Sequence, residues 1–205
     1  MPKVLLFGGS FDPIHFGHLI IARYVAEHLE AQRVVLIPSA SPPHKRGEAL
    51  APAADRLGMC RVAVAGDPLF EVSDWEVGQA GPNYTLHTVQ HFVETLPSAT
   101  GICWLIGMDS LLELATWYRV GELVECCTVV TAARPGYESA DWSKLAGVLT
   151  PGQIDRLRQH VMESPRIDVS ATEIRARVQA GRSIRYLVPE TVREFVEQGG
   201  LYRVT

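Results

Sequence analysis

The sequence predicts an α/β fold, organised as a Rossmann-like, doubly wound parallel sheet. Short apolar segments alternate with segments of helical periodicity along most of the 205 residues. Two of the apolar segments, residues 102–106 and 128–132, are typical of strands that helices cover on both faces. Polar or glycine-rich loops follow several of these strands, as expected at the carboxyl edge of such a sheet.

The first half of the chain supplies most of the expected elements. Strands are expected at 4–7, 33–37 and 69–73, in addition to the two named above. Helices are expected at 17–29, 52–65 and 85–96, the last with Leu86, Val89 and Val93 on one face. Residues 134–165 show the weakest pattern, with one helix expected near 151–162.

The last part of the chain has clear helix boundaries. Ser170 and Glu173 have the spacing of a capping box, which predicts a helix over 171–180 that ends at Gly181. Pro189 opens a last helix, and two glycines at 199–200 end it. We therefore expect one domain over residues 1–205, with a helical C-terminal part from about 171.

Composition and charge narrow the function classes. The chain is 47% hydrophobic and 20% charged, as in ordinary globular proteins, and its net charge of −4 argues against a nucleic-acid-binding surface. The four cysteines form no C-x-x-C pair, which favours free thiols in a reducing compartment over a zinc site. No secretory leader and no membrane span are expected, so we predict a cytoplasmic protein that binds neither membrane nor nucleic acid. A homo-oligomer is compatible with the sequence.

The most informative motif is G-G-S-F-D-P-I-H-F-G-H at residues 8–18. It joins the first strand to the first helix, where glycine amides and the helix N-terminus can bind a phosphate. His15 and His18 add two donors on one helical turn. The alternatives are a tight turn that binds nothing and histidines that only pack. The combination favours a nucleotide-phosphate site, with Asp12 as a turn residue before Pro13 rather than a metal ligand.

Three more polar loops are expected on the same rim. They follow the strands ending near residues 37, 106 and 132, and they contain residues 39–46, 107–110 and 133–135. Because parallel strands end at one edge, these loops and the glycine-rich turn meet in a single site.

Beyond these local patterns, the chain resembles the nucleotidyltransferases that carry an H-x-G-H motif. The second motif, S-A-T-E-I-R at 170–175, is similar to their S-S-T-x-I-R, with Ala171 in place of a serine. Residues 38–45, 82–88 and 107–117 narrow the resemblance to bacterial nicotinate-mononucleotide adenylyltransferases. The resemblance implies the nucleotidyltransferase type of the predicted fold. It also implies adenylyl transfer from ATP to nicotinate mononucleotide, giving deamido-NAD and pyrophosphate.

The resemblance further implies the ATP-binding residues. It assigns catalytic roles to His15, His18, Lys45 and Arg175, with solvated surface positions as the alternative for the two cations. It places ATP against Gly8, Gly9, Ser10, Phe11, His15, His18, Gly107, Asp109, Arg134, Ser170, Thr172, Ile174 and Arg175. For Asp109 and Ser170 the alternative is helix capping. Mg²⁺ is expected to accompany ATP, held by phosphates and water rather than by protein carboxylates.

The acceptor residues follow by the same route. The resemblance places nicotinate mononucleotide against Ser39, His44, Lys45, Tyr84, Thr85, Trp117 and Tyr118. Trp117 would stack on the pyridine ring, or else be an ordinary core aromatic. His87 and His91 have zinc-compatible spacing, but we expect packing roles because no third ligand is evident.

Two other functions remain open from the sequence. The same chemistry could serve nicotinamide mononucleotide, phosphopantetheine or another small phosphate, and the segments around Thr85 and Trp117 would distinguish these acceptors. A non-catalytic nucleotide sensor is the second alternative. The retained histidines, Lys45 and Arg175 argue against it, and turnover would separate the two.

Overall fold

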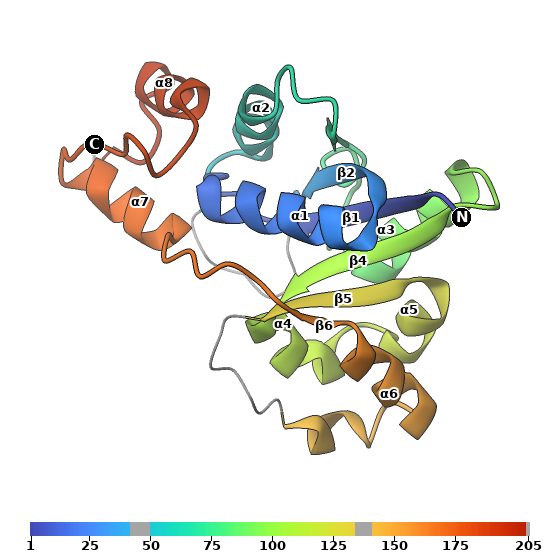
Figure 1. Cartoon of the computed structure of the whole chain (residues 1–205). Coiled ribbons are helices and arrows are strands. Elements are labelled where there is room, and N and C mark those ends of the chain that lie inside the picture. The colour runs from blue at the N-terminus through green and yellow to red at the C-terminus, as the bar shows by residue number, and fades with distance from the viewer. Residues whose placement is uncertain (42–49, 134–140, 204–205) are drawn as a thin grey trace.

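The strands form one six-stranded parallel sheet in the order β3-β2-β1-β4-β5-β6 (Figure 1). The computed structural model describes residues 1–41, 50–133 and 141–203. The strands are β1 (Lys3–Gly9), β2 (Ala31–Pro38), β3 (Phe70–Val72), β4 (Gly101–Gly107), β5 (Thr128–Ala133) and β6 (Val161–Glu163). The five strands expected from the sequence are confirmed within a few residues, and β6 is an addition to them.

Helices cover both faces of this sheet, as the apolar strands require. They are α1 (Phe16–Leu29), α2 (Ala53–Ala63), α3 (Thr85–Thr95), α4 (Met108–Glu113), α5 (Val120–Cys126), α6 (Pro151–Gln159), α7 (Ala171–Gln179) and α8 (Glu190–Gln198). Short 3-10 turns lie at Leu114–Thr116 and Trp142–Leu145. The helix expected over 151–162 ends at Gln159, because Val161–Glu163, one residue further on, pair with β5 as β6.

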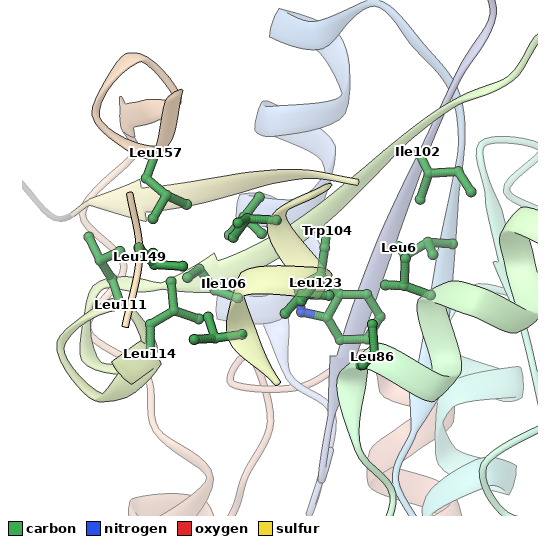
Figure 2. Close-up of a cluster of buried hydrophobic side chains, with 14 of the residues drawn as sticks. Leu6, Leu86, Ile102, Trp104, Ile106, Leu111, Leu114, Leu123, Leu149 and Leu157 are labelled. Carbon is green, nitrogen blue, oxygen red and sulfur yellow. The ribbon is translucent and has the colours of Figure 1, made fainter. Parts of the chain in front are cut away.

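Two hydrophobic clusters lie on opposite faces of the sheet. Alternate residues of β1 face opposite ways, so Val4 and Leu6 enter one cluster while Leu5 enters the other. The first cluster is built with α3, α4, α5 and α6, and Figure 2 shows Trp104 of β4 among its aliphatic side chains. The second is built with α1, α2, α7 and α8. This arrangement confirms the doubly wound fold.

The amphipathic face of α3 differs in one residue from the expectation. Leu86 and Val89 are fully buried, but Val93 is 47% exposed and Phe92 takes the buried place. In the described parts of the chain, no helix is both long enough and apolar enough to cross a membrane.

Candidate active site

The candidate site lies where the strand order of the parallel sheet reverses, between β1 and β4. β1 pairs with β2 on one side and with β4 on the other, so the loops after β1 and β4 turn to opposite faces and leave a crevice. A cavity of about 210 Å³ occupies this place. Its lining comes from the carboxyl ends of β1, β2 and β4, the start of α3 and the segment before α5.

Nine of the residues expected at the site line this cavity. They are Gly8, Gly9, Ser10, Ser39, Tyr84, Thr85, Gly107, Trp117 and Tyr118. Gly8 is needed here for a steric reason, because a Cβ would lie 2.6 Å from two ring carbons of the buried Trp104. The close approach of the glycine-rich turn to β4 therefore depends on a residue without a side chain.

The N-terminus of α3 forms one end of the cavity. Its N-cap residue, Tyr84, makes no side-chain capping bond, and the first helical residue, Thr85, lines the cavity. The Tyr84 ring stacks on Tyr118 with 4.5 Å between centroids. A helix end of this kind presents a partial positive charge, which suits an anionic group of a ligand.

The two histidines of the first motif are stacked, with 3.7 Å between ring centroids. The backbone N–H of His15 donates to His18 Nδ1 at 3.3 Å, so the neutral His18 ring carries its proton on Nε2. Burial lowers the pKa of His15 to about 4, and burial together with the neighbouring His15 lowers the pKa of His18 well below its usual value. Without a bound anion, both rings are therefore neutral at pH 7.

The second motif lies beside the glycine-rich turn. Arg175 Nη1 donates to the Asp12 carbonyl at 2.8 Å, across 163 residues of sequence, and Nη2 donates to Thr172 Oγ1 at 3.4 Å. Ser170 caps α7 by accepting from Glu173 N–H at 3.2 Å. The N-terminal turn of α7 and the start of α1 thus converge, as Figure 1 allows the reader to follow.

Other expected ATP-binding residues do not line the cavity. Ile174 is fully buried in the second cluster, so only its main chain is available to a ligand. Asp109 is exposed in the first turn of α4, and its capping alternative is wrong because Gly107 is the N-cap residue. Phe11, His15, His18, Ser170, Thr172 and Arg175 also lie outside the cavity lining. Of the residues expected to bind either substrate, His44, Lys45 and Arg134 lie outside the described residues.

A buried arginine that the sequence reasoning missed joins two rim loops. Arg56 of α2 is 1% exposed. Its guanidinium donates to the carbonyls of Ser10, Ser39, Ala40 and Ala51 at 2.6–3.3 Å. Burial lowers the pKa of Arg56, and the Asp12 carboxylate counters this effect. The available signal was the position of Arg56, which lies one helical turn before the apolar residues Met59 and Cys60.

Two buried polar residues of the cavity lining were also missed by the sequence analysis. Glu76 and Asn83 are buried and line the cavity. Glu76 accepts from Thr88 Oγ1 at 2.6 Å, and burial raises the pKa of this carboxyl. Asn83 Oδ1 accepts from the Ser39 hydroxyl at 3.1 Å and from Ser41 N–H at 2.8 Å. These bonds fix the loop after β2 against the start of α3.

The zinc-compatible histidines are engaged in aromatic contacts. His91 stacks on Trp75 at 4.7 Å, and His87 lies against Tyr84 and Tyr118. Within residues 1–41, 50–133 and 141–203, no three side chains from His, Cys, Asp and Glu gather closely enough to hold a metal ion.

Comparisons with known proteins find relatives along nearly the whole chain. The model of the cytidylyltransferase-like family matches residues 6–177. A protein of Rubrobacter xylanophilus, named as a probable nicotinate-nucleotide adenylyltransferase, is 42% identical over 202 residues, which cover 98% of this chain and 92% of that protein. A protein of Dehalococcoides mccartyi with the same name is 36% identical over 200 residues, covering 98% and 97%.

Solved structures show the same fold. A nicotinic acid mononucleotide adenylyltransferase of Plasmodium falciparum, complexed with NaAD, superposes with a TM-score of 0.77 over 98% of both chains, at 15% identity. The same enzyme complexed with APC gives a TM-score of 0.75. On the strength of the family model and the whole-length relatives, the chain belongs to the cytidylyltransferase-like family, as a member of its nicotinate-nucleotide adenylyltransferase group.

Proposed function

We propose that this protein transfers the adenylyl group of ATP to nicotinate mononucleotide, releasing pyrophosphate and forming deamido-NAD. The observation that carries this function is the pairing of two neighbouring sites at one sheet edge. The cavity between β1 and β4 has an aromatic wall and a helix N-terminus. The ring of His18 lies 6.0 Å from that of Phe7 in the cavity lining, and Arg175 of α7 binds the carbonyl of Asp12, two residues after Ser10 of the lining.

The cavity suits the pyridine nucleotide. Trp117 and Tyr118 offer aromatic surfaces, and the N-terminal end of α3 at Thr85 offers the partial positive charge that a nicotinate carboxylate requires. Ser39 adds a hydroxyl from the neighbouring loop. An amide in place of the carboxylate gains less from this helix end, which is why we place the acid form here.

The polar rim beside the cavity suits the triphosphate of ATP. The glycine-rich turn supplies backbone amides, His18 supplies Nε2–H, and Arg175 supplies a cation at the start of α7. Lys45, which lies outside the described residues, joins this set through the family resemblance alone.

The reaction needs alignment more than nucleophile activation. A 5′-phosphate oxygen of the acceptor attacks the α-phosphorus of ATP, the bond between this phosphorus and the bridging oxygen breaks, and pyrophosphate leaves with the electron pair. No proton has to be removed from the attacking phosphate oxygen. His18 and Arg175 stabilise the negative charge that grows on the transferred and leaving phosphates.

Mg²⁺ is the cation that we propose to enter with ATP. Such a cation would be held through the phosphates and water, since within the described residues no three His, Cys, Asp or Glu side chains gather as potential ligands. When bound, the cation would neutralise part of the phosphate charge. The residues of this chain would orient the phosphate oxygens that the cation does not contact.

We also propose that the protein acts in the cytoplasm as a single domain. The four thiols are free, and burial raises the pKa of Cys60 and Cys127, so these groups stay protonated and unreactive. The C-terminal helices from residue 171 share the second hydrophobic cluster with α1 and α2, which supports one continuous core.

Pyrophosphate release with a panel of acceptors tests the proposal. Nicotinate mononucleotide should give the highest kcat/KM with ATP, above nicotinamide mononucleotide and phosphopantetheine. His18→Ala should lower kcat/KM by ~10²–10³, the usual loss for one preorganised donor to developing charge. Equal turnover of the acid and amide acceptors would contradict the acceptor assignment, and absence of turnover with every acceptor would favour a nucleotide sensor.

A further inference from the structure

We propose that Tyr202 and Asp12 form a positioning pair for Arg175, in which the Tyr202 hydroxyl fixes the Asp12 carboxylate and this carboxylate orients the guanidinium toward ATP. The inference rests on the proposed function for the place of ATP. It assigns a role to a C-terminal residue that no sequence motif covers.

Asp12 is the centre of the arrangement. It is 1% exposed, and its two carboxylate oxygens have different surroundings. Oδ1 accepts from the Tyr202 hydroxyl at 2.7 Å and from Ala51 N–H at 3.2 Å. Among the described residues, Oδ2 has no hydrogen-bond partner, and it lies 3.8 Å from Arg175 Nη1. The two donors on Oδ1 therefore fix the rotation of the carboxylate, and Oδ2 faces Arg175.

This geometry attracts Arg175 without neutralising it. A close charge-assisted pair would have its nitrogen and oxygen about 2.7–2.9 Å apart, and a two-pronged pair would occupy both carboxylate oxygens. Here Oδ1 is already occupied, and the distance to Oδ2 is 3.8 Å. The firm contact of Arg175 is instead with the neutral Asp12 carbonyl at 2.8 Å. Its remaining N–H groups are left for an incoming phosphate.

Tyr202 is well placed to act as a fixed donor. It lies in the turn after α8 with φ of 63°, directly after Gly200 with φ of 60° and Leu201. Leu201 N–H donates to Val196 O at 3.1 Å, and Leu201 and Tyr202 pack against the second cluster. Burial, then the hydrogen bond to Asp12, raises the pKa of the Tyr202 phenol, so the hydroxyl keeps the proton that it donates.

The turn that carries Tyr202 is fixed by the packing of α8 against α2. Thr191 of α8 donates from its hydroxyl to the Val62 carbonyl of α2 at 2.8 Å. The phenyl ring of Phe195 packs so closely on α2 that a Cβ at Gly58 would lie 2.7 Å from it. The position of Tyr202 is therefore set by packing at a distance from Arg175, as a positioning role requires.

Tyr202→Phe isolates the hydroxyl while keeping the ring. With the donor removed, the carboxylate is free to rotate toward Arg175 and pair with it more closely. We expect kcat/KM for ATP and the affinity for a non-hydrolysable ATP analogue to fall about tenfold, the scale of one hydrogen bond to a charged group. The KM for nicotinate mononucleotide should stay within twofold.

A double-mutant cycle separates positioning from plain stability. In the Arg175→Lys background, Tyr202→Phe should change kcat/KM for ATP by less than twofold, because the group that it positions is gone. Asp12→Asn, which keeps an acceptor for Tyr202 but removes the charge, should reproduce the loss of ATP affinity. Tyr186→Phe is the matched control, since Tyr186 is 85% exposed, and it should match the wild type.

The outcomes distinguish this inference from the proposed function. If Tyr202→Phe binds the ATP analogue and turns over ATP like the wild type, or if its effect adds fully to that of Arg175→Lys, the inference is wrong. A lower Tm with unchanged ATP kinetics would likewise show a merely structural hydroxyl. If the wild type makes no dinucleotide, the proposed function fails, while titration with the ATP analogue still decides the role of Tyr202.

Discussion

The glycine between the two histidines of the first motif has a steric role. Gly17 is the second residue of α1, and a Cβ at this position would lie 3.0 Å from two atoms of the His15 ring. The stacked pair of imidazoles therefore depends on a missing side chain. The spacing H-x-G-H follows from this close approach as well as from the turn geometry.

Gly17→Ala should lower kcat/KM by about 10–10²-fold, because His15 must shift to make room for the new methyl group. Gly152→Ala is the matched control. Gly152 is also the second residue of its helix, α6, and nothing lies within 4 Å of a Cβ there. This control should keep full activity and gain slightly in stability. Steady-state kinetics of both variants test the prediction, and equal activity of the two would contradict it.

The buried His15 should make stability depend on pH. Its pKa is about 4 in the folded protein against 6.5 for the ordinary imidazole, so the unfolded chain binds more protons between these values. The free energy of unfolding should therefore fall as pH falls from about 6.5 to 4, by about 3 kcal/mol from this group. Above pH 6.5 the imidazole is neutral in both states and contributes no slope.

Urea unfolding between pH 4 and 8 measures this effect, with His15→Asn as the comparison. As the pH falls from about 6.5 to 4, the unfolding free energy of the wild type should decrease more than that of the variant. Two parallel curves would show that burial of His15 is not the cause.

At the scale of elements, α2 connects the loops that form the site. Arg56, in its first turn, donates to carbonyls of the loop after β1 and of the loop after β2. A buried guanidinium with four carbonyl partners is held in one geometry, and it holds both loops in return. The amide-rich turn after β1 is thereby fixed relative to the wall that carries Ser39.

Arg56→Met should destabilise the protein by about 3 kcal/mol, because several buried carbonyls lose their donor at once. Arg61→Met is the control on the same helix. Arg61 pairs with Asp74 on the surface, where both side chains are more than half exposed, so its loss should cost less than about 1 kcal/mol. Urea denaturation of the two variants gives the comparison, and equal costs would contradict the role of Arg56 as a clamp.

The sixth strand illustrates why some elements escape sequence analysis. β6 has only three residues, and it follows α6 after a single residue, His160. Three residues are too few to show a period of two, so the helix expected over 151–162 included the first two of them. Pairing with β5 decides the conformation of this segment, and these backbone hydrogen bonds leave no pattern in the sequence of side chains.

At the scale of the whole molecule, the two proposed substrate sites share one edge of the sheet but are built with helices from its opposite faces. The acceptor cavity is built with α3 and the segment before α5, which pack on one face of the sheet. The histidine pair and Arg175 belong to α1 and α7, which pack on the other face. A substitution on one side should therefore affect one substrate far more than the other.

Trp117→Ala should weaken binding of nicotinate mononucleotide by roughly tenfold or more, since an aromatic stacking contact is lost. The affinity for an ATP analogue should stay within twofold, because Trp117 lies on the acceptor side. Trp117→Phe is the matched control and should recover most of the acceptor affinity, since it keeps a ring. Separate calorimetric titrations with each ligand test this, and parallel loss of both affinities would contradict the separation.

The sequence by itself determined the order of strands β1 to β5 along the chain and the polar loops that follow them, and hence the edge where the site forms. Parallel strands all end at the same edge, so the loops after β1, β2 and β4 had to meet there whatever their detailed conformation. This is why Gly8, Ser39, Thr85 and Trp117 could be placed together from local patterns and the family resemblance.

Only the tertiary structure decided which buried side chains hold the site residues and their loops in position. Asp12 lies in the turn expected from the sequence, but its burial between Arg175 and Tyr202 was not expected, and Arg56 reaches two loops from α2. These partners are brought together by packing of α2, α7 and α8 on one face of the sheet. Local sequence patterns describe neighbours along the chain, whereas a buried polar group is satisfied by whichever distant segment folding places beside it.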